Sequence, residues 1–159
     1  MQETIFGRKK DVQFMGLALV QAQHAFDSGE VPIGAVVVDA HGTIIGSGFN
    51  QVEQLHTQCA HAEALAITQA GKTIADWRLD GCWLYVTLEP CSMCMALIRL
   101  CRLQGMVFGA DSPLFGYRLD NADLVSVYNK DPLLTVTGVY KEESSALLKE
   151  FFKQRRKEG

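Results

Sequence analysis

The order of hydrophobic and polar positions divides the chain into segments with helical spacing and short apolar runs typical of strands. Four segments place apolar residues at helical spacing and predict helices: about 12–26, 61–71, 91–103 and about 142–157. Four compact runs of β-formers predict strands: 33–39, 43–48, 83–87 and 105–109. Residues 111–132 carry turn residues without a sustained period, so we expect a loop with one helical turn at most, and 133–140 supply a last strand.

Two features of this order predict how the strands pair. The first two strands flank Ala40-His41-Gly42, and a short loop with glycine between β-branched runs indicates an antiparallel hairpin. In the second half, helices alternate with nearly continuous apolar strands, which favours parallel pairing. The pattern predicts a layered α/β fold, and because no repeat or linker divides the chain, we expect a single domain over 1–159.

Composition and charge narrow the class of protein. Hydrophobic residues make up 48% of the 159 positions and charged residues 21%, as in globular chains that bury a core. We find neither an apolar stretch of membrane-spanning length nor the apolar segment of a secretory signal, so we expect a cytoplasmic protein with no membrane partner. The net charge of −3 does not favour nucleic acid, so any polyanion requires a local basic patch.

The spacing of two cysteines indicates a metal site. The chain has five cysteines, an odd number without an export signal, which favours thiols or metal ligands over disulfides. Cys91 and Cys94 follow Pro90 at the start of a predicted helix, where the helix dipole favours thiolates and both sulfurs can reach one ion. His61, at the start of its own helix, can supply a third ligand. Three protein ligands leave one position of a tetrahedral zinc ion for water, as in catalytic sites.

The residue best suited to acid–base chemistry is Glu63. It lies two residues after His61, and within the first turn of a helix both side chains can border one pocket. A carboxylate beside zinc-bound water serves as a proton shuttle. We therefore predict that Glu63 is the catalytic residue.

The cysteines also allow other interpretations. A Cys-x-x-Cys pair in an intracellular chain can be redox-active or can form half of a structural zinc site. A structural site needs a fourth ligand, and the candidates are Cys59, His56, Cys82 and Cys101. Cys59 is the serious rival because it lies two residues before His61. We expect Cys82 and Cys101 to be core side chains, and Cys59 to be a small packed side chain near the metal.

Together these residues read H-x-E…P-C-x-x-C, the signature of zinc-dependent nucleobase deaminases. The chain resembles the cytidine deaminase superfamily, and within it the bacterial tRNA-specific adenosine deaminases, which form inosine at the anticodon wobble position. The resemblance extends over nearly the whole chain. It rests on segments 30–37, 48–50, 60–63, 84–91, 107–110 and 151–156.

The resemblance implies a fold and a set of site residues. The fold is a three-layer α/β/α sandwich around a mixed sheet of about five strands, and the assembly is a homodimer with its active sites near the interface. One Zn²⁺ per chain is bound by His61, Cys91 and Cys94. Asn50 hydrogen-bonds the target base, and the backbone of Ala62 faces the same pocket.

The resemblance also implies a hydrolase that edits RNA. A zinc-bound hydroxide attacks C6 of adenine, while Glu63 protonates N1 and later the departing amino group, which yields inosine and ammonia. The partner is a tRNA anticodon stem-loop, and the final helix, about 142–157, is an arm that contacts it.

Within this arm, Phe151 or Phe152 can stack on a base, and three basic residues can meet phosphates: Lys153, Arg155 and Arg156. The alternative is an amphipathic helix that packs both phenylalanines in the core and leaves the charges in solvent. A deaminase of a free base or nucleoside would not need such an arm.

The loop that follows Ala110 departs from the resemblance. These deaminases usually have an acidic residue, a lysine and a small glycine-rich loop there, whereas this chain has Asp-Ser-Pro-Leu-Phe-Gly-Tyr over 111–117. Asp111 is the one candidate substrate contact within it. Two other functions stay open: a deaminase of free guanine, cytosine or cytidine, and a zinc-containing RNA-binding module without catalysis. Glu63 counts against the second, because a structural site gains nothing from an unliganded carboxylate.

Overall fold

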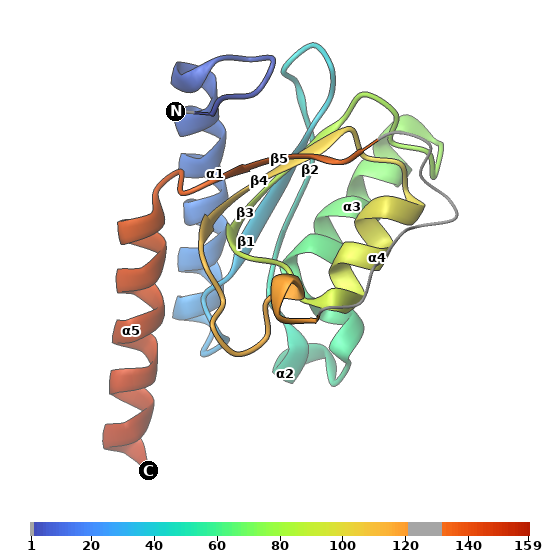
Figure 1. The fold of residues 1–159 in the computed structure, drawn as a ribbon. Helices are drawn as coiled ribbons and strands as arrows, with labels where there is room; N and C mark the ends of the chain where they lie inside the picture. Colours follow the sequence, from blue (N-terminus) through green and yellow to red (C-terminus); the bar gives the residue numbers. More distant parts are fainter. Residues whose placement is uncertain (1, 121–131) are drawn as a thin grey trace.

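The computed structural model describes residues 2–120 and 132–159 and forms three layers (Figure 1). Five strands make one sheet in the order β2-β1-β3-β4-β5. Helices α1 and α5 cover one face of the sheet, and α3 and α4 cover the other. This arrangement confirms the predicted α/β/α sandwich around a mixed sheet of five strands.

The elements follow one another nearly as the sequence pattern predicts. The helices are α1 (Arg8–Asp27), α2 (Val52–Leu55), α3 (Ala62–Ile74), α4 (Ser92–Leu100) and α5 (Lys141–Glu158). The strands are β1 (Gly34–Val38), β2 (Ile44–Phe49), β3 (Trp83–Leu88), β4 (Gly105–Ala110) and β5 (Leu134–Thr137). The 3₁₀ turns within the described residues are η1 (Gln58–Ala60) and η2 (Tyr117–Leu119). β1 pairs antiparallel with β2 and β3, whereas β3 with β4 and β4 with β5 are parallel, so both predicted modes of pairing are confirmed.

The strands divide their side chains between two cores, because successive residues of a strand point to opposite faces. One core lies under α1 and includes the strand residues Val36, Tyr85 and Val107. The other lies under α3 and α4 and includes Val37 and Leu84. β1 and β4 are buried along their whole length and β3 over nearly all of it, which explains why they read as continuous apolar runs in the sequence.

Glycine allows α3 to approach β2 closely, which places the start of α3 against the sheet. A Cβ atom added to Gly48 would lie 2.7 Å from the carbonyl oxygen of Ala62. One added to Gly46 would lie 2.2 Å from the carbonyl oxygen of Ala66. Both distances are collisions with backbone, so these two glycines fix how deeply the N-terminal half of α3 lies on the sheet.

Several predicted boundaries differ from the structure. α1 begins at Arg8 rather than at about 12. α3 continues past Gly71, where we expected it to stop, and ends only where Ala75 adopts a left-handed backbone with φ 57°. β5 is shorter than the predicted strand 133–140, because Gly138 and Tyr140 have positive φ and cannot continue an extended strand.

The remaining differences concern short elements. The pattern did not predict α2, whereas η2 is the helical turn expected within 111–132. The rest of that predicted loop, 121–131, lies outside the described residues. α4 ends at Leu100 rather than at 103, because Arg102 adopts a left-handed backbone with φ 61°.

In the described ranges we find no helix with the length and apolar character needed to cross a membrane.

Candidate metal centre

The candidate metal ligands come from the N-terminal ends of two neighbouring helices. His61 directly precedes α3, Cys91 directly precedes α4, and Cys94 lies in the first turn of α4. The His61 Nδ1 atom lies 3.6 Å from the Cys91 sulfur and 3.5 Å from the Cys94 sulfur. All three ligand atoms lie within 4.8 Å of one another. The fold therefore brings together the three residues that their spacing singled out.

The separation of these donors fits a tetrahedral zinc ion. Zinc binds sulfur at about 2.3 Å and nitrogen at about 2.0–2.1 Å, which separates adjacent tetrahedral ligands by about 3.6 Å. The nitrogen–sulfur distances of 3.5 and 3.6 Å match that value. Among the described residues no further histidine, cysteine or carboxylate joins the group. Three side chains can thus hold one zinc ion and leave its fourth position for water or substrate.

The hydrogen bonds within the group favour a thiolate. A hydrogen bond with the Cys94 thiol, supported by His61, lowers the pKa of Cys91 to about 4. The Cys91 sulfur in turn raises the pKa of His61 and that of Cys94. Because the thiolate is the form of cysteine that binds metals, Cys91 is ready to bind a cation at neutral pH.

Glu63 is a buried carboxylate in the first turn of α3. The residue is 5% exposed, and this burial raises the pKa of its carboxyl group to about 7, although hydrogen bonding to the backbone opposes the shift. A carboxyl group that titrates near neutrality can both accept and donate a proton. The proton-shuttle role of Glu63 stays a prediction, and its position beside the ligand group favours it.

Asn50 follows β2 and is held beside the start of α3. The residue is 7% exposed, and its side-chain amide donates to the carbonyl of Val31 at 3.3 Å. Its side-chain oxygen accepts from the backbone N–H of Val52 at 3.3 Å. The N–H of Gln51 donates to the carbonyl of Ala60 at 3.0 Å, which ties this segment to the chain just before the metal ligands. The hydrogen bond from Asn50 to a base stays a prediction.

A glutamate that the sequence pattern did not single out holds the segment after Asn50. Glu30 is 2% exposed, and its carboxylate accepts the backbone N–H groups of Glu53 at 3.2 Å and Gln54 at 2.7 Å. These donors belong to the first turn of α2, so Glu30 caps this short helix. The partners lie 23 and 24 residues apart in sequence, and a local pattern cannot report such a contact.

The other cysteines lie outside the ligand group. Cys59 is exposed, so our expectation of a packed side chain near the metal is wrong. The reason is local, because the turn η1 that carries Cys59 buries only Ala60. Cys82, at 4% exposure, is confirmed as a core residue, and Cys101 is half-buried at the edge of the same core.

The structure separates the two phenylalanines of the predicted RNA arm. Phe151 is 7% exposed, and its ring packs edge-on against Phe26 with a centroid distance of 5.9 Å. Phe152 is 45% exposed. The Arg155 guanidinium lies over the Phe151 ring at 5.2 Å and donates to the carbonyl of Gly29. The position of Phe151 therefore favours the core alternative over base stacking, whereas Phe152 remains accessible.

The last two predicted site residues have different surroundings. Ala62 is fully buried at the first position of α3, where its backbone lies between His61 and Glu63. Asp111, which follows β4, accepts hydrogen bonds from Lys141 at 2.8 Å and from Arg118 at 2.6 Å. These two cations hold the pKa of Asp111 below its usual value. Its predicted contact with substrate would therefore compete with two ion pairs.

A family model and a sequence relative match this chain. The model of the cytidine and deoxycytidylate deaminase zinc-binding region matches residues 8–110, which is more than half of the chain. The tRNA-specific adenosine deaminase of Aquifex aeolicus is 42% identical over 149 residues, which cover 90% of this chain and 94% of that protein.

Solved structures share the fold. One structure comes from work on A-to-I editing by tRNA:A34 deaminases at the wobble position of transfer RNA. It superposes with a TM-score of 0.76 and 35% sequence identity, and the match covers 86% of this chain and 99% of the solved chain. The guanine deaminase of Bacillus subtilis has a TM-score of 0.59 and 36% identity over 62% of this chain and 63% of its own. Proteins described as acting on tRNA and on guanine thus share this fold. The fold alone therefore does not identify the substrate of this chain.

Proposed function

Since the chain belongs to the cytidine and deoxycytidylate deaminase family, we propose that it is a zinc-dependent hydrolase that converts the wobble adenosine of a tRNA anticodon to inosine. The observation that carries this proposal is the group of His61, Cys91 and Cys94 beside the buried Glu63. The choice of a tRNA substrate is supported by the similarity to tRNA-specific adenosine deaminases, which extends over 90% of the chain.

The site residues divide the reaction between them. A zinc ion held by His61, Cys91 and Cys94 supplies the Lewis acidity that makes water a nucleophile at neutral pH. Glu63 accepts the proton of that water and passes protons to N1 of adenine and to the departing amino group. One water molecule is consumed and one ammonia is released, so adenosine becomes inosine. Asn50 orients the base at the entrance to the site.

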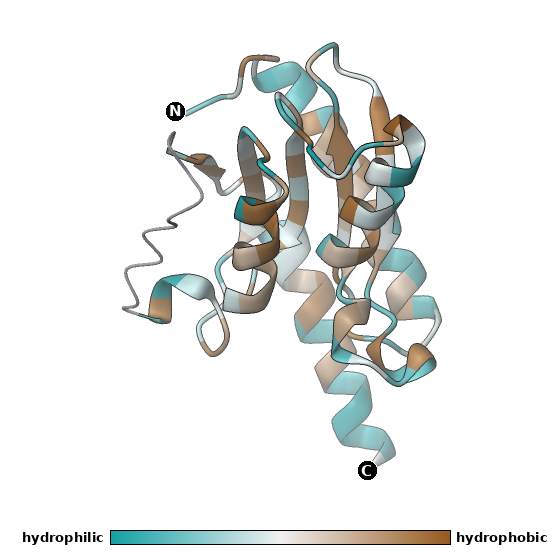
Figure 2. Ribbon diagram, turned by 90° about the vertical axis from the view of Figure 1, so that its right-hand side faces the viewer, coloured by the Kyte–Doolittle hydropathy of each residue, from teal (hydrophilic) through white to brown (hydrophobic). Residues whose placement is uncertain are grey.

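The terminal turns of α5 are the proposed basic patch for RNA. These turns are hydrophilic and extend beyond the rest of the fold in both views (Figures 1 and 2). Lys153, Arg156 and Lys157 are exposed there, together with Phe152. Exposed cations meet phosphates, and an exposed ring can stack on an unpaired base, which matches an anticodon loop better than a free nucleobase.

Assembly and location follow from the same proposal. We place the protein in the cytoplasm, where bacterial tRNA is processed, and we propose a homodimer. The dimer is supported by exposed apolar side chains on α4, since Met93 is 42% exposed and Leu100 is 47% exposed. Light scattering during size-exclusion chromatography tests the assembly, and a mass of one chain at micromolar concentration would contradict it.

The test of the function compares substrates. The zinc-loaded protein is incubated with an anticodon stem-loop that carries adenosine at the wobble position, with the same stem-loop carrying adenosine elsewhere in the loop, and with free guanine, cytosine and cytidine. We expect inosine only from the first RNA. Ammonia from guanine without inosine from the stem-loop would replace the proposal with a free-base deaminase, and no product from any substrate would favour an RNA-binding module.

A further inference from the structure

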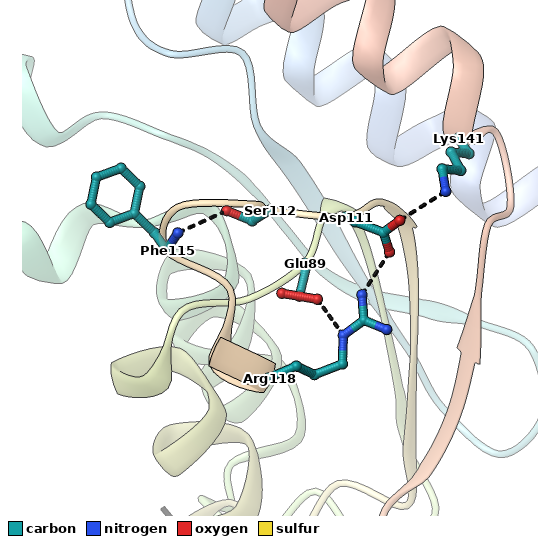
Figure 3. Close-up of polar contacts among 6 residues, drawn as sticks. All are labelled: Glu89, Asp111, Ser112, Phe115, Arg118 and Lys141. Carbon is teal, nitrogen blue, oxygen red and sulfur yellow. Dashed lines mark hydrogen bonds and ion pairs between the residues drawn. The ribbon is translucent and has the colours of Figure 1, made fainter. Parts of the chain in front are cut away.

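A buried carboxylate lies two residues before the first cysteine ligand, and the proposed reaction does not use it. Glu89 comes between the end of β3 and Pro90, and its side chain is 2% exposed. Its carboxylate forms an ion pair with the Nε atom of Arg118, which lies in η2 after β4 (Figure 3). A buried charge requires a partner, so the positive charge of Arg118 compensates the negative charge of Glu89 just before the turn that carries Cys91.

The guanidinium of Arg118 has two further contacts. Its Nη2 atom donates to Asp111 at 2.6 Å, and Asp111 also accepts from Lys141 at the start of α5 (Figure 3). The central carbon of the guanidinium lies over the ring of Phe108, 5.1 Å from the ring centroid. Arg118 therefore joins two carboxylates and an aromatic ring, and this planar group with several donors is poorly replaced by lysine.

Backbone contacts attach the same loop to the turn that carries Cys91. The N–H of Tyr117 donates to the carbonyl of Pro90 at 2.9 Å. Gly116 packs directly on Glu89, because a Cβ atom added there would lie 1.4 Å from a Glu89 carboxylate oxygen. The loop over 111–120 is thus clamped onto the residues just before the first cysteine ligand.

We propose that Arg118 is a positioning residue for the metal centre. Through Glu89 it fixes the turn from which Cys91 extends, and through Asp111 it fixes the loop that borders this turn. The proposal rests on the deaminase function for its kinetic part only. Residues that orient metal ligands from outside the coordination sphere control metal affinity and rate, and their loss commonly reduces either by about 10- to 100-fold.

The same loop presents an aromatic side chain on its other side. Phe115 is 76% exposed and points away from the ion pairs (Figure 3), and its N–H contacts the hydroxyl oxygen of Ser112 at 3.4 Å. The ion pair with Glu89 thus lies where the loop contacts the turn before Cys91. Loss of Arg118 should therefore affect zinc retention and kcat first, with a smaller effect on KM for RNA.

The first experiment compares two cations of the same network. Arg118→Lys keeps the charge but cannot reproduce the contacts of the guanidinium, whereas Lys141→Met removes a charge whose ion pair, among the described residues, is with the exposed carboxylate of Asp111. For Arg118→Lys we expect zinc affinity, measured by chelator competition, and kcat on the stem-loop to fall by about tenfold or more. For Lys141→Met we expect both to stay at the wild-type value. Equal losses in the two variants would overturn the proposal, because they would mean that any disturbance of the ion-pair network lowers both quantities.

The second experiment separates positioning from stability. Arg118→Gln leaves Glu89 buried without a cation and is expected to lower the Tm, and adding Glu89→Gln removes the unpaired charge and should restore most of the Tm. We expect zinc affinity and kcat to stay low in this double variant. Recovery of both together with the Tm would mean that Arg118 only stabilises the fold, and the proposal would fail.

The two proposals fail separately. If the wild-type protein makes no inosine while the zinc affinities of the variants follow the expected order, the tRNA function fails and the positioning role stands. If the wild-type protein makes inosine and Arg118→Lys retains wild-type zinc affinity and kcat, the positioning role fails and the function stands.

Discussion

The metal centre and the terminal turns of α5 differ in how firmly the fold holds their side chains. Cys94 is fully buried and Glu63 is 5% exposed, and both lie in the first turns of helices that pack on the sheet. In the terminal turns of α5, Phe152 is 45% exposed and the basic residues around it are exposed. The first region is built for one geometry, whereas the second leaves its side chains free to adapt, as the proposed contact with an RNA loop requires.

This difference predicts two kinds of response to substitution. Residues that act together on one reacting atom are strongly non-additive, so the loss of any one of them removes most of the rate. Exposed cations that meet phosphates contribute separately, and removing each one has a graded effect. The following substitutions test this contrast.

The largest effect is expected for Cys94→Ala. Two ligands would remain, and two ligands do not hold zinc at the affinity of a three-ligand site, so both zinc content and inosine formation should fall below detection. The matched control is Cys101→Ala, which removes a half-buried cysteine at the other end of α4. The control should retain one zinc ion per chain. A Cys94→Ala protein that keeps its zinc would contradict the assigned ligands.

The next effect is expected for Glu63→Gln. The substitution keeps the shape of the side chain and removes its ability to carry a proton, so zinc content should be unchanged while kcat falls by about 10²–10⁴-fold. Metal analysis and single-turnover kinetics on the stem-loop measure the two quantities. Loss of zinc together with activity would make Glu63 a ligand, and a rate near that of the wild type would refute its role as a proton shuttle.

The contrast also explains how much of the site the sequence could predict. The metal ligands have short spacings and lie where helices begin, so local pattern and helix dipole together identified His61, Cys91 and Cys94. The order and pairing of the strands were predictable for a similar reason, because burial on both faces leaves continuous apolar runs.

What the sequence did not predict depends on contacts between distant segments. The pair of Glu89 and Arg118 spans 29 residues, and Arg118 lies in a stretch without any period. Helix α2 is capped by the carboxylate of Glu30, which precedes β1 in sequence. The composition of α2 alone therefore does not predict the helix. Phe151 and Phe152 are adjacent and chemically identical, and packing against Phe26, a residue distant in sequence, distinguishes the buried Phe151 from the exposed Phe152.

A graded effect is expected for Lys153→Ala combined with Arg156→Ala. Each phosphate interaction that is removed should lower the slope of log affinity against log salt concentration by about 0.7–0.9, and kcat at saturating RNA should not change. Fluorescence anisotropy with a labelled stem-loop at several salt concentrations measures the slope. The matched control is Arg8→Ala with Lys9→Ala, which removes the same two types of charge at the start of α1, at the opposite end of the molecule from the tip of α5 (Figure 1). Equal slopes in the two variants would mean that the charges of α5 lie in solvent without contacting RNA.

The smallest effect is expected for Cys59→Ala, which tests the boundary of the metal centre. Cys59 is exposed and does not belong to the ligand group, although it lies two residues before His61 in sequence. Surface substitutions of this kind usually change stability by about 0.5 kcal/mol or less, so Tm, zinc affinity and kcat should all match the wild type. In the zinc-loaded wild type, a thiol reagent should modify Cys59 quickly while the zinc-bound cysteines react slowly, and the fast phase should lose one equivalent in the variant. Reduced zinc affinity with an unchanged fast phase would instead show that the Cys59 sulfur closes the metal site, because a fourth protein ligand leaves no position for water.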